Sequence, residues 1–190
     1  MKAGKIMEIL RQLPYYTREN LALALDKKGE NLNYWIKKLV GEKLLIPIKN
    51  GMYISDLYPK SEIYWEQIAN VARCPSYISL EYTLAKYGLI PEQPVAITSI
   101  TLKSPREYFT PSLKLIYRNI KPELFGDYQF EPVKIAYPYK AMFDYLYLRP
   151  IGKENRINWE ALDMRNRQEF LRICGESGSV KMKKIAAKLL

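Results

Sequence analysis

The sequence contains no histidine, and this absence removes several classes of enzyme at once. Ser-His-Asp triads, histidine metal ligands and imidazole acid–base catalysis all need that side chain. Cysteine is almost as scarce, because Cys74 and Cys174 stand alone and lack the Cys-x-x-Cys spacing of zinc or redox sites. We therefore expect no metal site, no cofactor and no disulfide. Two partly buried thiols in a reducing compartment are the expected state.

Glycine-rich loops and long apolar runs are also missing. The nine glycines are dispersed along the chain, so no loop is built to cradle a phosphate group. No apolar run approaches the roughly 20 residues of a membrane span. The first residues lack the long apolar core of a signal peptide. These absences predict a cytoplasmic protein that makes no contact with a membrane.

The charge is basic and unevenly distributed. The net charge is +10 over 190 residues. Residues 1–55 carry ten Lys and Arg against five Asp and Glu, residues 56–135 carry nine of each, and residues 136–190 carry eleven against six. The excess positive charge therefore lies toward the two ends. A solvated basic surface is one explanation, and a polyanion partner such as nucleic acid is the other.

Residues 17–55 have the order of parts of a winged helix-turn-helix. Thr17 is a good N-cap for a short helix, and residues 26–29 (DKKG) interrupt it. A second helix is predicted from about Asn31. Asn50-Gly51 then separates two apolar runs, which is a strong β-hairpin signal because both residues tolerate positive φ. An earlier helix over residues 5–13, ended by Pro14, would complete a three-helix scaffold.

The rest of the chain predicts an α+β domain with a small, mainly antiparallel sheet and flanking helices. We place the winged helix-turn-helix at residues 1–57 and this mixed domain at residues 60–190. Ser61 and Ser79 are expected to cap helices. Period-two patterns predict short strands over residues 95–101, 106–110, 113–118 and 132–136. Helical spacing returns from Lys140, and further helices are predicted over residues 159–173 and 180–190.

One face of the second predicted helix carries the residues that a recognition helix uses. Asparagine can bond bidentately to adenine, and lysines at the helix start and hairpin can meet phosphates. Trp35 lies on the apolar side of that helix and is expected to pack in the core. The candidate DNA-binding residues are Lys27, Lys28, Asn31, Asn33, Tyr34, Lys37, Lys38, Lys49 and Asn50.

The last two predicted helices are basic as well. A solvated surface and a docking face for DNA, RNA or an acidic partner are both compatible with this pattern. The candidate partner face consists of Arg165, Arg167, Arg172, Lys181, Lys183, Lys184 and Lys188.

Two other classes of function have weaker support in the sequence. Asp127, Glu131 and Lys134 could mimic a metal-dependent nuclease, but Glu-Pro-Val-Lys does not put both side chains on one strand face. Sixteen tyrosines could stack on single-stranded nucleic acid. Several have core-compatible spacing, so we interpret these as packing residues: Tyr64, Tyr87, Tyr108, Tyr117 and Tyr147.

Several downstream segments resemble one family. They are residues 76–91 (SYISLEYTLAKYGLIP), the apolar Thr-containing stretch 95–101, residues 121–126 (KPELFG) and residues 135–147 (IAYPYKAMFDYLY). In this order they are similar to the AbiEi-type antitoxins of type IV abortive-infection toxin–antitoxin systems, which are also described as predicted transcriptional regulators of viral defence. The resemblance covers most of residues 5–150. Tyr139 departs from the family, which usually has Glu there.

The resemblance implies a winged-helix domain that represses its own operon, binding inverted repeats in double-stranded DNA at its own promoter. It also implies a C-terminal domain that counters a nucleotidyltransferase-type toxin without needing a tight complex with it. We therefore predict a sequence-specific DNA-binding repressor and antitoxin with no catalytic activity. A winged-helix transcription factor without a toxin partner is the principal alternative.

Overall fold

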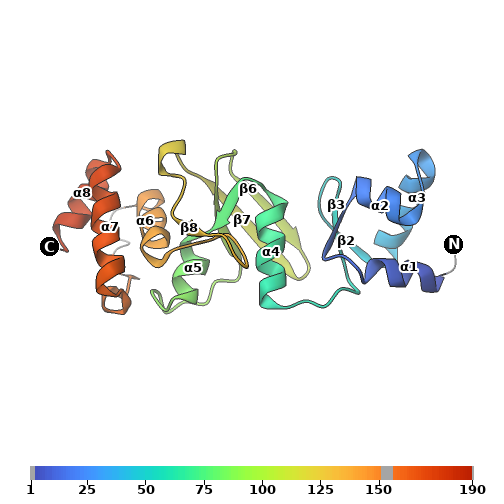
Figure 1. The fold of residues 1–190 in the computed structure, drawn as a ribbon, viewed down its shortest axis with the longest axis horizontal. Helices are drawn as coiled ribbons and strands as arrows, with labels where there is room; N and C mark the ends of the chain where they lie inside the picture. Colours follow the sequence, from blue (N-terminus) through green and yellow to red (C-terminus); the bar gives the residue numbers. More distant parts are fainter. Residues whose placement is uncertain (1–2, 151–155, 190) are drawn as a thin grey trace. The chain divides into compact units, whose positions relative to one another are not determined.

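A computed structural model describes residues 3–150 and 156–189. The fold is α+β, as predicted, and the described residues form eight α-helices, a three-stranded antiparallel sheet and a six-stranded mixed sheet (Figure 1). The chain divides into two compact units, Met1–Ala72 with Tyr108–Leu113, and Arg73–Glu107 with Lys114–Leu190. None of the described helices is long and apolar enough to cross a membrane.

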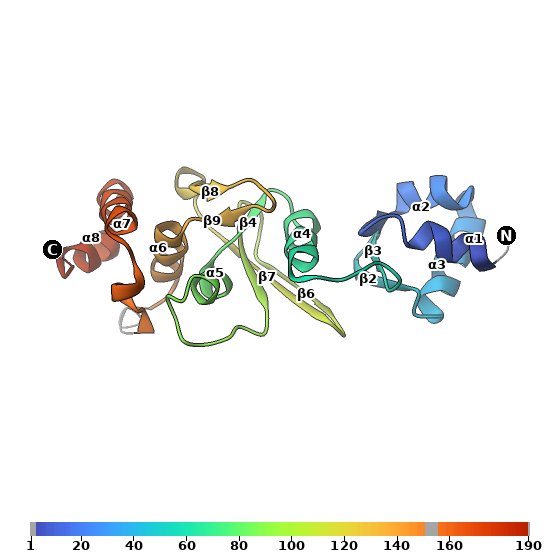
Figure 2. The ribbon, with the colours of Figure 1, turned by 60° about the horizontal axis from the view of Figure 1, so that its bottom comes forward.

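The first unit contains α1 to α4 and the three-stranded sheet, of which Figures 1 and 2 label β2 and β3. The strand order of this sheet is β1-β3-β2. Its elements are α1 (Ala3–Leu10), β1 (Tyr15–Thr17), α2 (Arg18–Leu25), α3 (Gly29–Gly41), β2 (Leu45–Lys49), β3 (Met52–Ser55) and α4 (Glu62–Ala72). The boundary that we predicted at residues 57–60 lies in the loop before α4, whereas the compact units divide after Ala72.

Local sequence signals account for several of these elements. The Thr17 side chain accepts a hydrogen bond from the Asn20 N–H at 3.3 Å and caps α2. The Ser61 hydroxyl does the same for the Tyr64 N–H at 3.2 Å and caps α4. The predicted hairpin forms between β2 and β3 around Asn50-Gly51. The strand β1 was not predicted, although two tyrosines and a threonine favour an extended backbone.

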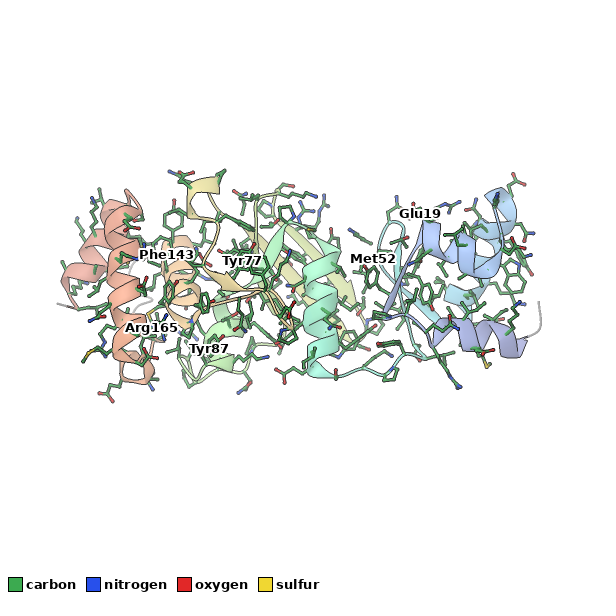
Figure 3. The ribbon with its side chains drawn as sticks, viewed as in Figure 1. Glu19, Met52, Tyr77, Tyr87, Phe143 and Arg165 are labelled. Carbon is green, nitrogen blue, oxygen red and sulfur yellow. The ribbon has the colours of Figure 1, made fainter. Side chains whose placement is uncertain are left out.

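The remaining elements build the six-stranded sheet and the helices beside it. They are β4 (Ser76–Ile78), α5 (Leu80–Lys86), β5 (Ile97–Thr101), β6 (Arg106–Thr110), β7 (Leu113–Asn119), β8 (Tyr128–Gln129), β9 (Ile135–Ala136), α6 (Pro138–Leu148), α7 (Met164–Glu176) and α8 (Val180–Ala187), with 3₁₀ turns at Pro122–Leu124 and Trp159–Ala161. In Figures 1 and 2, α6 lies between the sheet and α7. The buried side chains Tyr77 and Phe143 belong to the core of this unit (Figure 3).

The sheet that we predicted as mainly antiparallel is a six-stranded mixed sheet. The strand order is β6-β7-β5-β4-β9-β8. Two of its pairs are parallel, β5 with β7 and β4 with β9, while β4 with β5 and β8 with β9 are antiparallel. Period-two patterning shows which residues are extended but carries no information on strand direction, which the connections between strands decide. The sheet is therefore mixed.

The helix predicted over residues 159–173 is present but starts later than predicted. A 3₁₀ turn at Trp159–Ala161 comes first, and α7 starts only at Met164. The Asp163 side chain accepts from the Asn166 N–H at 2.8 Å, so a strong N-cap sets the later start. The last predicted helix ends at Ala187, and its predicted final residue, Leu190, lies outside the described residues.

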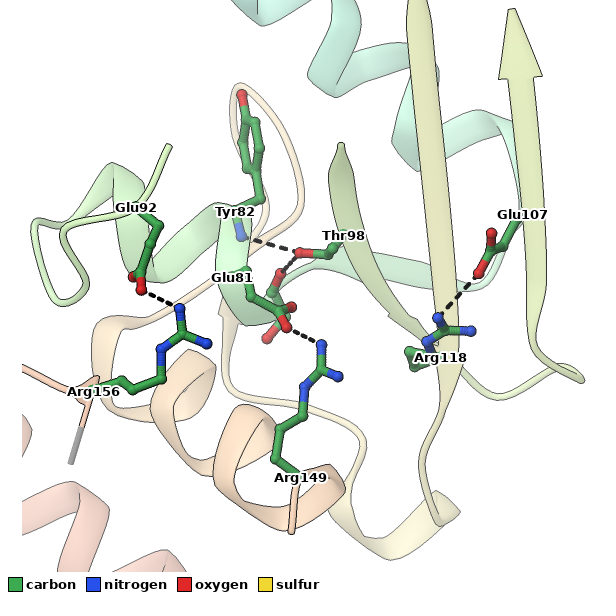
Figure 4. Close-up of polar contacts among 9 residues, drawn as sticks. Glu81, Tyr82, Glu92, Thr98, Glu107, Arg118, Arg149 and Arg156 are labelled. Atoms are coloured by element: carbon green, nitrogen blue, oxygen red, sulfur yellow. Dashed lines mark hydrogen bonds and ion pairs between the residues drawn. The ribbon is translucent and has the colours of Figure 1, made fainter. Parts of the chain in front are cut away.

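Ser79 precedes α5 as predicted, but its side chain does not cap that helix. The Ser79 hydroxyl donates instead to Oδ2 of Asp144 at 2.7 Å. Thr98 of β5 takes over the capping bond. Its hydroxyl accepts from the Tyr82 N–H at 3.1 Å and donates to the Ser79 carbonyl at 2.6 Å (Figure 4). A distant strand therefore supplies the cap, which sequence spacing could not reveal.

Asp144 is the centre of a buried polar network in the second unit. Lys140 donates to Oδ1 of Asp144 at 2.5 Å and to the Leu124 carbonyl at 2.7 Å, and the two charged side chains are 3% and 0% exposed. Tyr77 donates to Oδ2 of Asp144 at 3.0 Å. Burial raises the pKa of the Asp144 carboxyl, and the bonds from Lys140, Ser79 and Tyr77 oppose that rise. The network joins β4, α6 and the loop before β8.

Removing the Asp144 carboxylate should be strongly destabilising. Asp144→Ala leaves the buried Lys140 ammonium without its counterion, so we expect the free energy of unfolding to fall by about 3–5 kcal/mol. Arg118→Ala is the matched control, because it breaks the half-exposed pair of Arg118 with Glu107 and should change stability by no more than about 1 kcal/mol. Urea unfolding measures both, and equal losses in the two variants would contradict the role of burial.

Candidate nucleic-acid interface

The orientation of α3 is fixed by its apolar stripe. Leu32, Ile36 and Leu39 are buried, at 3%, 7% and 1% exposure. They join one hydrophobic cluster with Ile6, Ile9 and Leu10 of α1 and with Leu21 and Leu25 of α2. Each such side chain contributes about 1.5–3 kcal/mol when it is fully buried. Because three of them face inward, the opposite side of α3 is held in solvent.

The turn that leads into α3 relies on left-handed backbone. Asp26 closes α2 at φ 51°, and its N–H bonds back to the Leu23 carbonyl at 3.2 Å. Gly29 opens α3 at φ 54°, a conformation that costs glycine little. Lys27 and Lys28 lie between them, half-buried and exposed respectively. Both lysines therefore stand at the start of α3, where we predicted phosphate contacts.

The predicted recognition residues lie together on the exposed side of α3. Tyr34 is 60% exposed and meets the Trp35 ring edge-on at 5.9 Å between centroids. Trp35 itself is half-buried and packs against the core cluster, as expected. The exposed side chains of the predicted set on this helix are Asn31, Asn33, Tyr34, Lys37 and Lys38.

Two of the predicted lysines have partners within the first unit. The Lys38 ammonium lies 5.0 Å from the centroid of the Trp35 ring and 4.0 Å from Glu42. Lys49 donates to the carbonyl of Ala72, the last residue of α4, at 2.7 Å. Lys49 therefore holds the end of the hairpin to α4 and is not a freely extended side chain.

The hairpin turn itself is anchored on one side. Gly51 has φ 73°, a left-handed conformation that suits glycine at this turn, and its carbonyl accepts from the Arg18 N–H at 3.0 Å. Asn50 is exposed beside it. The backbone of the turn is thus tied to the start of α2, while the Asn50 side chain faces solvent.

Glu30 was not among the predicted DNA-binding residues. It is exposed and lies in the first turn of α3. It precedes Asn33, Tyr34 and Lys37 by three, four and seven residues, the spacing that puts side chains on one side of a helix. That spacing is readable in the sequence, but a carboxylate is not one of the basic or amide groups that bind phosphates and adenine.

In the second unit, arginines are paired with glutamates. Arg118 contacts Glu107 at 3.0 Å, and Arg149 and Arg156 are bonded to Glu81 and Glu92 (Figure 4). These pairs offset positive charge locally. No equivalent ion pair of Lys37 is present among the described residues of the first unit.

The candidate partner face on α7 and α8 is partly committed to internal bonds. Arg172 bonds to Glu169 and Glu176 at 2.9 and 2.6 Å, and Arg167 donates to the Trp159 carbonyl at 2.9 Å. Lys181 donates to the Tyr147 and Arg149 carbonyls. Of the predicted set, Arg165, which Figure 3 labels on α7, is exposed together with Lys183, Lys184 and Lys188.

The residues considered for the alternative functions differ in burial. Tyr64 and Tyr117 are buried, and Tyr87, Tyr108 and Tyr147 are half-buried, consistent with packing. Asp127 and Glu131 are exposed, and Lys134 is half-buried. Across residues 3–150 and 156–189, no three or more Cys, Asp or Glu side chains are grouped so that they could hold a metal ion.

A pocket of about 260 Å³ lies in the second unit. It is lined by residues of the 123–127 loop, by Lys140 and Phe143 of α6, and by α7 residues including Arg172 and Glu176. Both of its cations have partners, because Lys140 bonds to the buried Asp144 and Arg172 bonds to Glu176. The exposed side of α3 therefore remains the stronger candidate interface.

Comparison with known proteins adds no relative. No model of a known protein family matches the chain, and no curated protein matches it significantly. The family resemblance therefore stays a prediction, and the geometry of α3 and the hairpin carries the proposed function.

The contact of Lys49 with Ala72 predicts a structural role for this side chain. Lys49→Met removes a partly buried, charge-assisted hydrogen bond, so we expect the free energy of unfolding to fall by about 1–2 kcal/mol. Lys28→Met is the control, because Lys28 is exposed and its side chain makes no capping bond; its effect should stay within about 0.5 kcal/mol. Thermal unfolding measures both, and an unchanged Lys49→Met protein would show that the bond contributes nothing.

Proposed function

We propose that this protein is a sequence-specific DNA-binding transcriptional repressor whose N-terminal part is a winged helix-turn-helix. The single observation that carries the proposal is the exposed side of α3, which presents Asn33, Tyr34 and Lys37 from a helix locked in place by its buried stripe. A recognition helix enters the major groove with side chains of this kind. The hairpin β2–β3 is the wing, with Asn50 exposed at its turn.

The charge distribution supports a polyanion as the partner. Ten Lys and Arg stand against five Asp and Glu in residues 1–55. Lys27, Lys28 and Lys37 surround the start and exposed side of α3, where they can neutralise phosphates. Arg118, Arg149 and Arg156 of the second unit are paired with glutamates, which makes these three arginines weaker candidates for the same role.

We propose further that the protein acts as the antitoxin of a type IV toxin–antitoxin system in phage defence, and that it represses its own operon. This part depends on the resemblance of residues 76–147 to AbiEi-type antitoxins. The second unit supplies the antitoxin activity in this proposal, and Arg165, Lys183 and Lys184 are the exposed cations available to a partner there.

DNA binding is tested by a salt titration. Fluorescence anisotropy of the full chain on the duplex upstream of its own gene should show that log K falls linearly with log salt concentration. Lys37→Ala should reduce the slope by about 0.9, because one phosphate contact is lost, and Lys5→Ala on α1 should leave the slope unchanged. Asn33→Ala should alter preference between sequences instead.

Two results would overturn the DNA-binding proposal. One is association that does not respond to salt, or no association at all. The other is a preference for single-stranded over duplex oligonucleotides of the same sequence, which would favour the stacking class of nucleic-acid binder.

The antitoxin proposal is tested through the neighbouring gene. If that gene encodes a nucleotidyltransferase, its induction should arrest growth, and co-expression of the full chain should restore it. The Lys37→Ala variant should restore growth as well, because it affects only the DNA-binding unit. An unrelated neighbour, or arrest that the chain does not relieve, would leave a transcription factor without a toxin partner as the better description.

A further inference from the structure

Glu30 occupies the solvent-facing stripe of α3. At 100° per residue, positions i, i+3, i+4 and i+7 fall on one side of a helix. Glu30, Asn33, Tyr34 and Lys37 have this spacing, and all four are exposed. The buried residues Leu32, Ile36 and Leu39 lie on the opposite side. The carboxylate thus stands in line with the residues that we propose to face DNA.

Among the described residues, the Glu30 carboxylate forms no salt bridge and no side-chain hydrogen bond. This distinguishes it from Glu42, which lies 4.0 Å from Lys38, and from the paired glutamates of the second unit. No described side chain therefore neutralises the Glu30 carboxylate. On a surface that approaches phosphates, an unpaired negative charge weakens binding to any duplex.

A stabilising role at the start of the helix is the other explanation for this position. A carboxylate in the first turn interacts favourably with the helix dipole. Its place in line with Asn33, Tyr34 and Lys37 adds repulsion toward phosphates, which a role in helix stability alone does not need.

We infer that Glu30 is a specificity-determining residue that accepts a hydrogen bond from the exocyclic N4 amino group of a cytosine in the major groove. On the major-groove edge, cytosine presents its N4 amino group as a hydrogen-bond donor and has no acceptor beside it. A carboxylate can accept a hydrogen bond from this amino group. Residues at the N-terminal end of a recognition helix are the ones that reach base edges. The inference rests on the proposed function, because it requires α3 to lie in the groove.

The test uses the full chain and a library of duplexes with 20 randomised base pairs, selected at fixed salt and sequenced. The wild type should enrich a motif containing a C·G pair at one position. Glu30→Gln, which can donate as well as accept, should relax that position about five- to tenfold and bind non-specific duplex more tightly. Glu8→Gln is the matched control, because it removes the same charge from an exposed site on α1.

Glu30→Asp separates base reading from a role in helix stability. Aspartate keeps the charge in the first turn but is one methylene shorter, so it should relax the same position while the melting temperature stays close to that of the wild type. This variant also keeps the test informative if Glu30→Gln fails to fold.

The outcomes distinguish the inference from the function on which it rests. If the wild type enriches a motif and both Glu30 variants enrich the same motif with equal stringency, the inference is wrong while DNA recognition stands. If Glu30→Gln and Glu8→Gln relax selection equally, the effect is general electrostatics and the inference is also wrong. If the wild type enriches no motif, sequence-specific binding and the inference fail together.

Discussion

The packing of Leu32, Ile36 and Leu39 into the helical core is the constraint on which the candidate interface depends. An amphipathic helix has an apolar side and a polar side, so burying the apolar side fixes the direction in which the polar side faces. The exposed stripe of α3 is therefore as well defined as the core behind it. Its polar residues are displayed by a rigid element, which is what base recognition requires, because a hydrogen bond to a base edge tolerates little error in position.

The two units use charge in opposite ways. In the second unit the strongest polar interactions point inward, where Asp144 gathers Lys140, Ser79 and Tyr77, and surface arginines such as Arg149 are matched with glutamates. In the first unit, Lys28 at the start of α3 is exposed, and it has no ion pair among the residues that the structure describes. Buried and matched charges fix a fold, whereas exposed, unmatched charges of one sign attract a polyanion. For this reason our proposal places nucleic-acid binding in the first unit.

The parts of this fold that could be predicted were encoded locally. Thr17 and Ser61 each cap a helix by accepting a hydrogen bond from the N–H three residues later, and Asn50-Gly51 predicts its hairpin. Features that depend on contacts between segments far apart in the sequence were not predicted. Strand direction in the mixed sheet depends on the connections, and the hydroxyl of Ser79 is drawn from its own helix to Asp144, 65 residues away. The acceptor for Lys49 likewise lies on α4, so the sequence alone could not identify this partner.

In the proposed DNA-binding mode, Glu30 changes what the lysines around it can achieve. Phosphate contacts are independent of sequence, so a face composed only of lysine and amide groups would hold every duplex almost equally well. A carboxylate lowers the affinity for every duplex. This loss is compensated only at sites where a base donates a hydrogen bond to the carboxylate. Specificity is a difference between affinities, and it grows when the wrong sites are weakened as well as when the right one is strengthened. On this argument, the one acidic residue on the exposed stripe of α3 contributes more to discrimination than an additional lysine would.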